Sequence, residues 1–193
     1  MTRLLGSRET SLRNIFAGVA SGGHIGASAK LLSLEEWEEF IKALGFVGPD
    51  ISERDMRFAF VWSRMCVIDE RTERGFLRAC CLPFEGFLEA LCRVAVLKAL
   101  PTDEEIEESG CKHAGEYFEW VREFDEEHYK NMLARRGSAW GDEPPTPENT
   151  ANALGKTIDV MFHIIERATT GADEGKVRQS EVVQFLKKNN LHV

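Results

Sequence analysis

The chain has 193 residues, of which 43% are hydrophobic and 29% are charged, and its formal net charge is −8. This composition is typical of a folded globular protein and excludes wholesale disorder. The acidic balance argues against a nucleic-acid partner, because an acidic surface repels the phosphate backbone. The same sign of charge is compatible with binding of cations or of basic amphipathic helices.

The five cysteines include no Cys-x-x-Cys pair, and Cys80 and Cys81 are adjacent. We interpret all five as reduced, mostly buried thiols of an intracellular protein, with a redox role for the adjacent pair as an alternative. The sequence has no apolar run of roughly 18 residues, so no membrane span is predicted. No clear cleavage pattern follows the N-terminus, and a cytoplasmic location is predicted.

Helical periodicity runs through the first hundred residues. Ser33 and Glu36 have the spacing of a capping box at a helix start, and Ser52 caps the next helix. The charged stretch at residues 69–74 lacks apolar periodicity and is predicted to be a loop. The predicted helices cover residues 12–19, 34–44, 52–63 and 83–100.

The second half of the chain is also periodic, with one interruption. Thr102 and Glu105 form another capping box, and a long polar helix is predicted for residues 111–136. Residues 137–149 contain three prolines and two glycines and are predicted to form an extended linker. Because no run alternates Val, Ile and Thr, at most two-residue ladders between loops are expected. The last two predicted helices cover residues 150–167 and 179–188.

One short pattern occurs three times, at residues 32–41, 82–91 and 177–186. In each copy an apolar residue precedes a helix start, another follows five positions later, and two more follow at eight and nine. Each copy also comes after a predicted helix and a loop. A pattern that recurs in this way indicates a repeated supersecondary unit.

This repeat resembles the second half of a calmodulin-like EF-hand that has lost most of its calcium ligands. In an EF-hand loop the apolar eighth residue joins a short ladder to the partner loop, and the acidic twelfth residue ligates calcium. An apolar residue that enters the core comes next. The corresponding residues here are Leu32, Leu82 and Val177 for the ladder, Glu36, Gly86 and Glu181 for the last ligand, and Trp37, Phe87 and Val182 for the core.

The resemblance implies an all-α fold with four parts. An EF-hand-like helix–loop–helix pair would occupy residues 9–100, and a long helical segment would occupy residues 101–136. The linker at residues 137–149 would then lead to a third helix–loop–helix unit at residues 150–190. A helix–loop–helix protein unrelated to EF-hands could show the same apolar pattern, and this remains an alternative.

Only the third loop, residues 170–181, has the frame of a calcium-binding loop. Gly175 takes the sixth position, where the EF-hand loop turns sharply. Thr170 and Ala172 replace the usual carboxylates at the first and third positions, so at most a weak site is expected. No other cofactor is predicted. The candidate calcium ligands are Thr170, Glu174, Lys176 and Glu181.

The remaining residues form no catalytic motif, and the chain is predicted not to be an enzyme. Asp125 and His128 could place two metal ligands on one helix face, but no second pair accompanies them. The glycine-rich stretch at residues 22–26 lacks the lysine and the spacing of a P-loop. No feature selects one cysteine as a nucleophile.

The resemblance implies a non-catalytic protein-binding or scaffold subunit. Paired EF-hands present an apolar trough to an amphipathic helix, and degenerate members serve as fixed subunits of cytoskeletal, ciliary or membrane-associated assemblies. The partner would be a helix of a larger protein. Most of the trough residues must also form the core. They are Phe16, Trp37, Phe40, Phe58, Phe60, Phe87, Leu91 and Val94.

Four residues of the second half are predicted to contact the partner, because an unpaired third unit would leave apolar surface uncovered. Two alternative functions remain open. The first is a calcium sensor that uses residues 170–181, and the second is a lineage-specific accessory subunit of a large complex with only superficial EF-hand similarity. The predicted partner-binding residues are Trp120, Phe124, Phe185 and Leu186.

Overall fold

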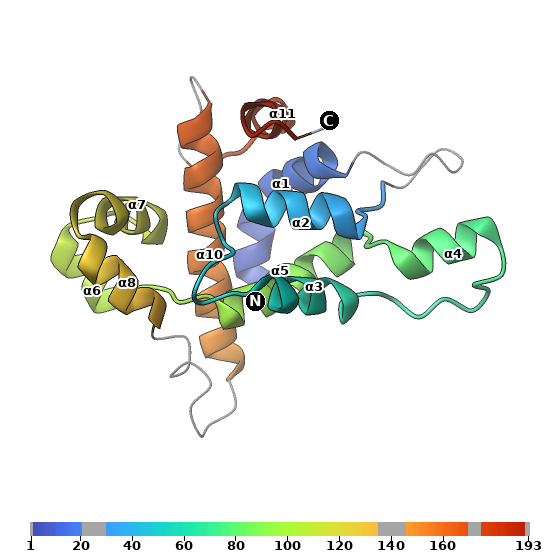
Figure 1. Ribbon diagram of the computed structural model, residues 1–193, viewed down its shortest axis with the longest axis horizontal. Coiled ribbons are helices and arrows are strands. Elements are labelled where there is room, and N and C mark those ends of the chain that lie inside the picture. The colour runs from blue at the N-terminus through green and yellow to red at the C-terminus, as the bar shows by residue number, and fades with distance from the viewer. Residues whose placement is uncertain (1, 21–29, 135–145, 170–174, 192–193) are drawn as a thin grey trace.

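The computed structural model describes residues 2–20, 30–134, 146–169 and 175–191. Within these ranges the fold is all-α, with ten helices and no β-strand, which confirms the predicted fold class (Figure 1). The long helix α10 lies between a lobe made of α6, α7 and α8 and the helices of the first hundred residues.

Three helices of the first hundred residues, α2, α3 and α5, begin within one residue of the predicted start, whereas α1 begins ten residues before the predicted residue 12. Ser33 and Ser52 each accept a hydrogen bond from the third backbone N–H of the helix that follows. In return, the Glu36 carboxylate accepts from the backbone N–H of Ser33 at 2.8 Å. Such reciprocal caps satisfy N–H groups that have no partner inside the helix. The helices are α1 (Thr2–Val19), α2 (Leu34–Ala43), α3 (Glu53–Val61) and α5 (Phe84–Leu97).

Leu32 and Leu82 form an isolated antiparallel bridge, in which each backbone N–H donates to the carbonyl of the other residue at 2.8 Å. Both side chains are fully buried. The bridge lies just before α2 and α5, so it holds the starts of these two helices side by side. The short ladder expected between these two residues is therefore confirmed.

The aromatic residues at the repeated core position meet in the centre of the first hundred residues. The rings of Trp37 and Phe87 are 6.3 Å apart in an edge-to-face arrangement, and Phe16 of α1 lies 5.6 Å from Phe87. The indole Nε1 of Trp37 donates to the carbonyl of Met56 at 3.0 Å. Trp37 therefore joins α2 to α3 by a hydrogen bond and to α5 by ring packing.

Helix α4 (Glu73–Cys80) was not predicted, because its first residues belong to a charged stretch that was assigned to a loop. The hydroxyl of Thr72 accepts a hydrogen bond from the backbone N–H of Gly75 at 3.0 Å and caps the helix. Only Gly75 is buried in α4, so the helix has no apolar stripe long enough to give a periodic signal. It stands away from the other helices (Figure 1).

The single long helix predicted for residues 111–136 is wrong. Two shorter helices, α7 and α8, occupy the described part of this range after the separate helix α6, and the break between them falls at Asp125, whose backbone is not helical. The Asp125 carboxylate accepts from the backbone N–H of His128 at 2.9 Å, which favours a new helix start over continuation. Phe118 and Tyr129 then pack edge to face at 5.5 Å. The helices are α6 (Asp103–Ser109), α7 (Ala114–Phe124) and α8 (Glu126–Ala134).

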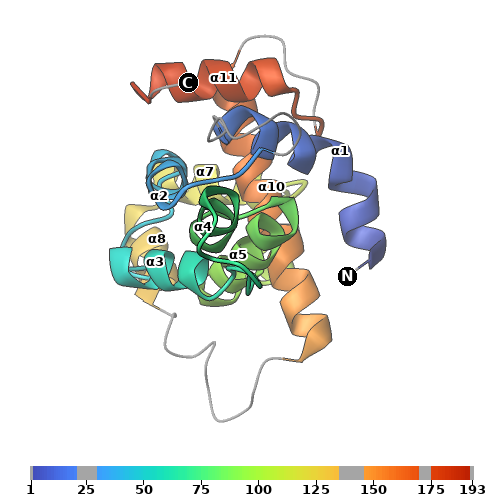
Figure 2. The same cartoon turned by 90° about the vertical axis from the view of Figure 1, so that its right-hand side faces the viewer.

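The last two helices are α10 (Pro147–Ala168) and α11 (Gln179–Lys188). Helix α10 begins three residues earlier than predicted, because Pro147 is well suited to the first turn of a helix and Thr146 caps it. The predicted linker thus ends at Thr146, and residues 137–145 lie outside the described residues. Helix α10 packs on α5 and α7, and α11 packs across α1 (Figure 2).

Val177 is the third residue expected at a ladder position. Its backbone forms hydrogen bonds with side chains of α1 and not with the backbone of Leu32 or Leu82. Its N–H donates to the hydroxyl of Ser11 at 3.1 Å, and its carbonyl accepts from the amide of Asn14 at 3.0 Å. The third helix–loop–helix unit is therefore attached to the first through side chains of α1.

A buried ion pair within the first hundred residues lies against the α6–α8 lobe. The ammonium of Lys98, just after α5, donates to the carboxylate of Asp50 at 2.6 Å, and both side chains are almost completely buried. The ammonium also lies 5.6 Å from the ring centre of Phe46 and 5.1 Å from that of Phe118 on α7. Burial lowers the pKa of Lys98, and the charge of Asp50 opposes this shift.

The first prediction concerns Trp37. Replacing it with alanine should lower the free energy of unfolding by about 3–5 kcal/mol, because a fully buried indole is lost and the Met56 carbonyl loses its donor. Denaturant unfolding monitored by circular dichroism measures this change. A loss below about 1 kcal/mol would mean that Trp37 does not pack in the core as described.

The second prediction concerns the buried ion pair. Asp50→Asn should lower the free energy of unfolding by about 3–5 kcal/mol, because the buried Lys98 charge loses its counter-charge. Adding Lys98→Met should recover most of this loss, since the double variant buries no charge. Equal stability of the single and the double variant in denaturant titrations would contradict this interpretation.

Candidate functional site

The candidate calcium loop is only partly described, and its visible residues have other roles. Thr170 and Glu174 lie outside the described residues. Gly175 has a positive φ of 76°, as the sharp turn at this position requires, and Lys176 is exposed. The carboxylate of Glu181 accepts from the backbone N–H of Arg178 at 2.7 Å, so it caps α11. A negative charge in the first turn is favourable without any metal ion.

The two other loops end on a capping residue and on a glycine. Glu36 closes the capping box of α2, and Gly86 has no side chain to offer. Gly86 also lies close to the segment that follows α3, since an added Cβ would be 3.0 Å from the carbonyl oxygen of Ser63. In the described part of the chain, no three His, Cys, Asp or Glu side chains come together as a metal site would require.

The polar cluster between α7 and α10 connects these two helices. His163 Nε2 lies 2.8 Å from the Glu119 carboxylate, and Arg167 lies 2.7 Å from its other oxygen. Burial acts to raise the pKa of Glu119, but the His163 hydrogen bond and the Arg167 charge outweigh it and lower this pKa. Gly115 allows the close approach, because an added Cβ would be 2.5 Å from the Cβ of His163.

Two of the five thiols, those of Cys81 and Cys92, are poorly suited to nucleophilic chemistry. Burial raises the pKa of Cys92 to about 11 and also raises the pKa of Cys81. A thiol with such a pKa remains protonated at neutral pH, whereas a nucleophilic cysteine needs a thiolate. None of the described cysteines is in a disulfide.

The four residues predicted to contact a partner fall into two groups. Phe185 and Leu186 are only 2% and 4% exposed, because α11 packs its apolar face against α1. The prediction that these two contact a partner is therefore corrected: they belong to the internal core. Trp120 and Phe124 on α7 are 43% and 70% exposed and remain accessible to a partner.

Six large hydrophobic side chains are exposed in the described residues, and four of them lie between residues 62 and 76. This stretch includes the end of α3, the segment that leads to α4, and the first half of α4. We call it the 62–76 surface. Clustered exposed apolar side chains commonly mark interaction sites. The four residues are Trp62, Met65, Ile68 and Phe76.

One side of the 62–76 surface opens into a groove of about 380 Å³ between α3 and α5. The rings of Phe58 and Trp62 stack there with centres 5.0 Å apart, and Arg54 lies 5.1 Å from the Phe58 ring. Val96 and Leu97 of α5 line the opposite wall. Of the trough residues expected from the sequence, only Phe58 is partly exposed, which confirms that most of that set forms the core.

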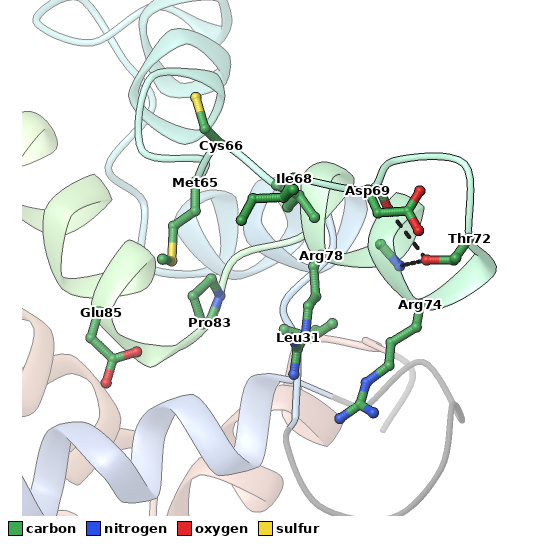
Figure 3. A pocket seen from close by; sticks show the side chains of 12 residues that line it. Leu31, Met65, Cys66, Ile68, Asp69, Thr72, Arg74, Arg78, Pro83 and Glu85 are labelled. Carbon is green, nitrogen blue, oxygen red and sulfur yellow. Dashed lines mark hydrogen bonds between the residues drawn. The ribbon is translucent and has the colours of Figure 1, made fainter.

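The other side opens into a hollow of about 510 Å³ beneath α4 (Figure 3). Met65, Ile68 and Pro83 line it with apolar side chains. Arg74 and Arg78 extend along it from α4. The sequence did not reveal this site, because it depends on how residues 64–81 leave the helical body and return to the Leu32–Leu82 bridge.

No protein-family model, curated protein or solved structure matches the chain. Among the helices of the described ranges, none has both the length and the apolar character that crossing a bilayer requires.

The third prediction concerns calcium. Isothermal titration with millimolar calcium should give no binding heat, because Glu181 already caps α11 and two loop positions lack their carboxylates. Glu181→Gln should leave the titration unchanged. A saturable heat that disappears in Glu181→Gln would instead support the calcium-sensor alternative.

Proposed function

We propose that this chain is a non-catalytic protein-binding module built from degenerate EF-hand-like helix–loop–helix units. Its 62–76 surface would bind the apolar face of an amphipathic helix that belongs to a larger protein. The observation that carries the proposal is the exposure of Trp62, Met65, Ile68 and Phe76 along one stretch that joins a groove to a hollow.

Two features support the EF-hand-like part of the proposal. The repeat alignment pairs Leu32 with Leu82, and these two residues form an isolated antiparallel bridge. The same alignment pairs Trp37 with Phe87, whose rings pack together in the core. In this view α4 is an insertion into the second loop, between the entering helix α3 and the exiting helix α5.

The chemistry of the 62–76 surface supports binding of a protein segment. Trp62 is 64% exposed although one face of its ring stacks on Phe58. Tryptophan and arginine dominate the energetics of many protein interfaces, and here Arg54 and Arg93 adjoin the groove. Apolar side chains at helical spacing could enter the groove and the hollow in succession.

The fourth prediction tests this surface. Trp62→Glu and Ile68→Glu should each weaken partner binding at least about tenfold, because each places a charge where an apolar contact is proposed. Gln184→Glu on the exposed side of α11 is the matched control, since it adds the same charge elsewhere. Partners would be identified by crosslinking and mass spectrometry in cells and then measured with purified proteins.

Both variants should stay folded, because the replaced side chains are exposed. Circular dichroism verifies this point. If both folded variants bind the identified partner with wild-type affinity, the 62–76 surface is not the binding site. If Gln184→Glu weakens binding equally, the effect arises from overall charge and the proposal also fails.

A further inference from the structure

The two remaining exposed aromatic residues, Trp120 and Phe124, lie one helical turn apart on the outer face of α7. The opposite face of α7 packs on α10 through Gly115 and the Glu119–His163 contact. Trp120 touches Tyr117 at a ring distance of 6.1 Å, and no described element covers Phe124. We call this exposed side the outer face of α7.

The outer face of α7 belongs to the α6–α8 lobe, which is strongly acidic. Residues 103–134 contain eleven acidic and three basic residues, a net charge of −8. The whole chain also has a net charge of −8, so the rest of the sequence is neutral on balance. A lobe with this excess of negative charge attracts a positively charged partner. Salt screens this attraction, so it weakens as the ionic strength rises.

Some acidic residues of the lobe have a basic partner, among them Glu126, which pairs with Lys130. Those near α10 have cationic partners, as in the pairs of Asp103 with Lys156 and Glu119 with Arg167. Glu123 and Glu127 are exposed and form no ion pair within the described ranges, and they lie on either side of Phe124 in the sequence. The outer face of α7 therefore combines its two aromatic side chains with Glu123, and the start of α8 adds Glu127 just beyond the break at Asp125.

Contacts within the chain fix the position of the outer face of α7 without a partner. Tyr117 Oη lies 3.0 Å from His128 Nε2, and Phe118 packs on Tyr129, so α8 is fixed against α7. The contacts to α10 fix α7 itself. A surface that does not reorganise on binding loses less conformational entropy than a flexible one.

We propose that the outer face of α7 binds a basic amphipathic helix of a protein partner. The apolar side of that helix would contact Trp120 and Phe124, and its lysine or arginine side chains would meet Glu123 and Glu127. This site is separate from the 62–76 surface, since α4 and α7 lie at opposite ends of the long axis of the molecule (Figure 1). One chain can then hold two helices of different chemistry.

The test uses a designed helical peptide with leucine on one face and lysine on the other, and a matched peptide with glutamate in place of lysine. Fluorescence anisotropy with the full chain should show saturable binding of the lysine peptide only. Trp120→Ala/Phe124→Ala should weaken this binding at least about tenfold without changing the charge. Glu123→Gln/Glu127→Gln should weaken it and reduce its dependence on salt concentration.

Trp62→Ala is the matched control, because it removes an exposed tryptophan from the other surface, and it should leave lysine-peptide binding unchanged. Equal binding by the wild type and by folded Trp120→Ala/Phe124→Ala overturns the inference, as does equal binding of the two peptides. A loss of binding in Trp62→Ala alone would place the peptide on the 62–76 surface. That result overturns this inference while leaving the proposed function intact.

Discussion

The buried Asp50–Lys98 ion pair is the interaction on which the arrangement of the molecule depends. Removing two charges from water costs several kcal/mol for each ion, and the cost is offset only when their geometry is held closely. Asp50 comes from the turn before α3, Lys98 follows α5, and the Phe118 ring beside the ammonium comes from α7. The contact with Phe118 therefore adds to the packing of α7 on α10, which positions the α6–α8 lobe.

Helix α10 determines which surfaces remain open. It covers α5 and α7, and α11 covers α1, so most of the apolar area of the repeated units is used inside the chain. Among the described residues, the large exposed hydrophobic side chains are those of the 62–76 surface and of the outer face of α7. They differ in chemistry, because arginine side chains border the first and carboxylates surround the second. Two partners of different charge would be discriminated by this difference.

The parts of the fold that the sequence predicted depend on interactions between residues close in the chain. Ser33, Ser52 and Thr102 mark helix starts because their side chains bond to N–H groups three residues ahead. The repeat also predicted the Leu32–Leu82 bridge, since equivalent residues of paired units meet. The break at Asp125 was missed, because apolar periodicity continues across it and only a local side-chain bond favours a new helix start.

The sequence by itself determined the all-α class, most helix starts and the pairing of Leu32 with Leu82. Only the tertiary structure decided which apolar faces are covered. Phe185 and Trp120 both follow helical periodicity, yet Phe185 is buried against α1 while Trp120 faces outward. Periodicity shows that a helix has an apolar face, but what packs on that face depends on segments far away in the chain.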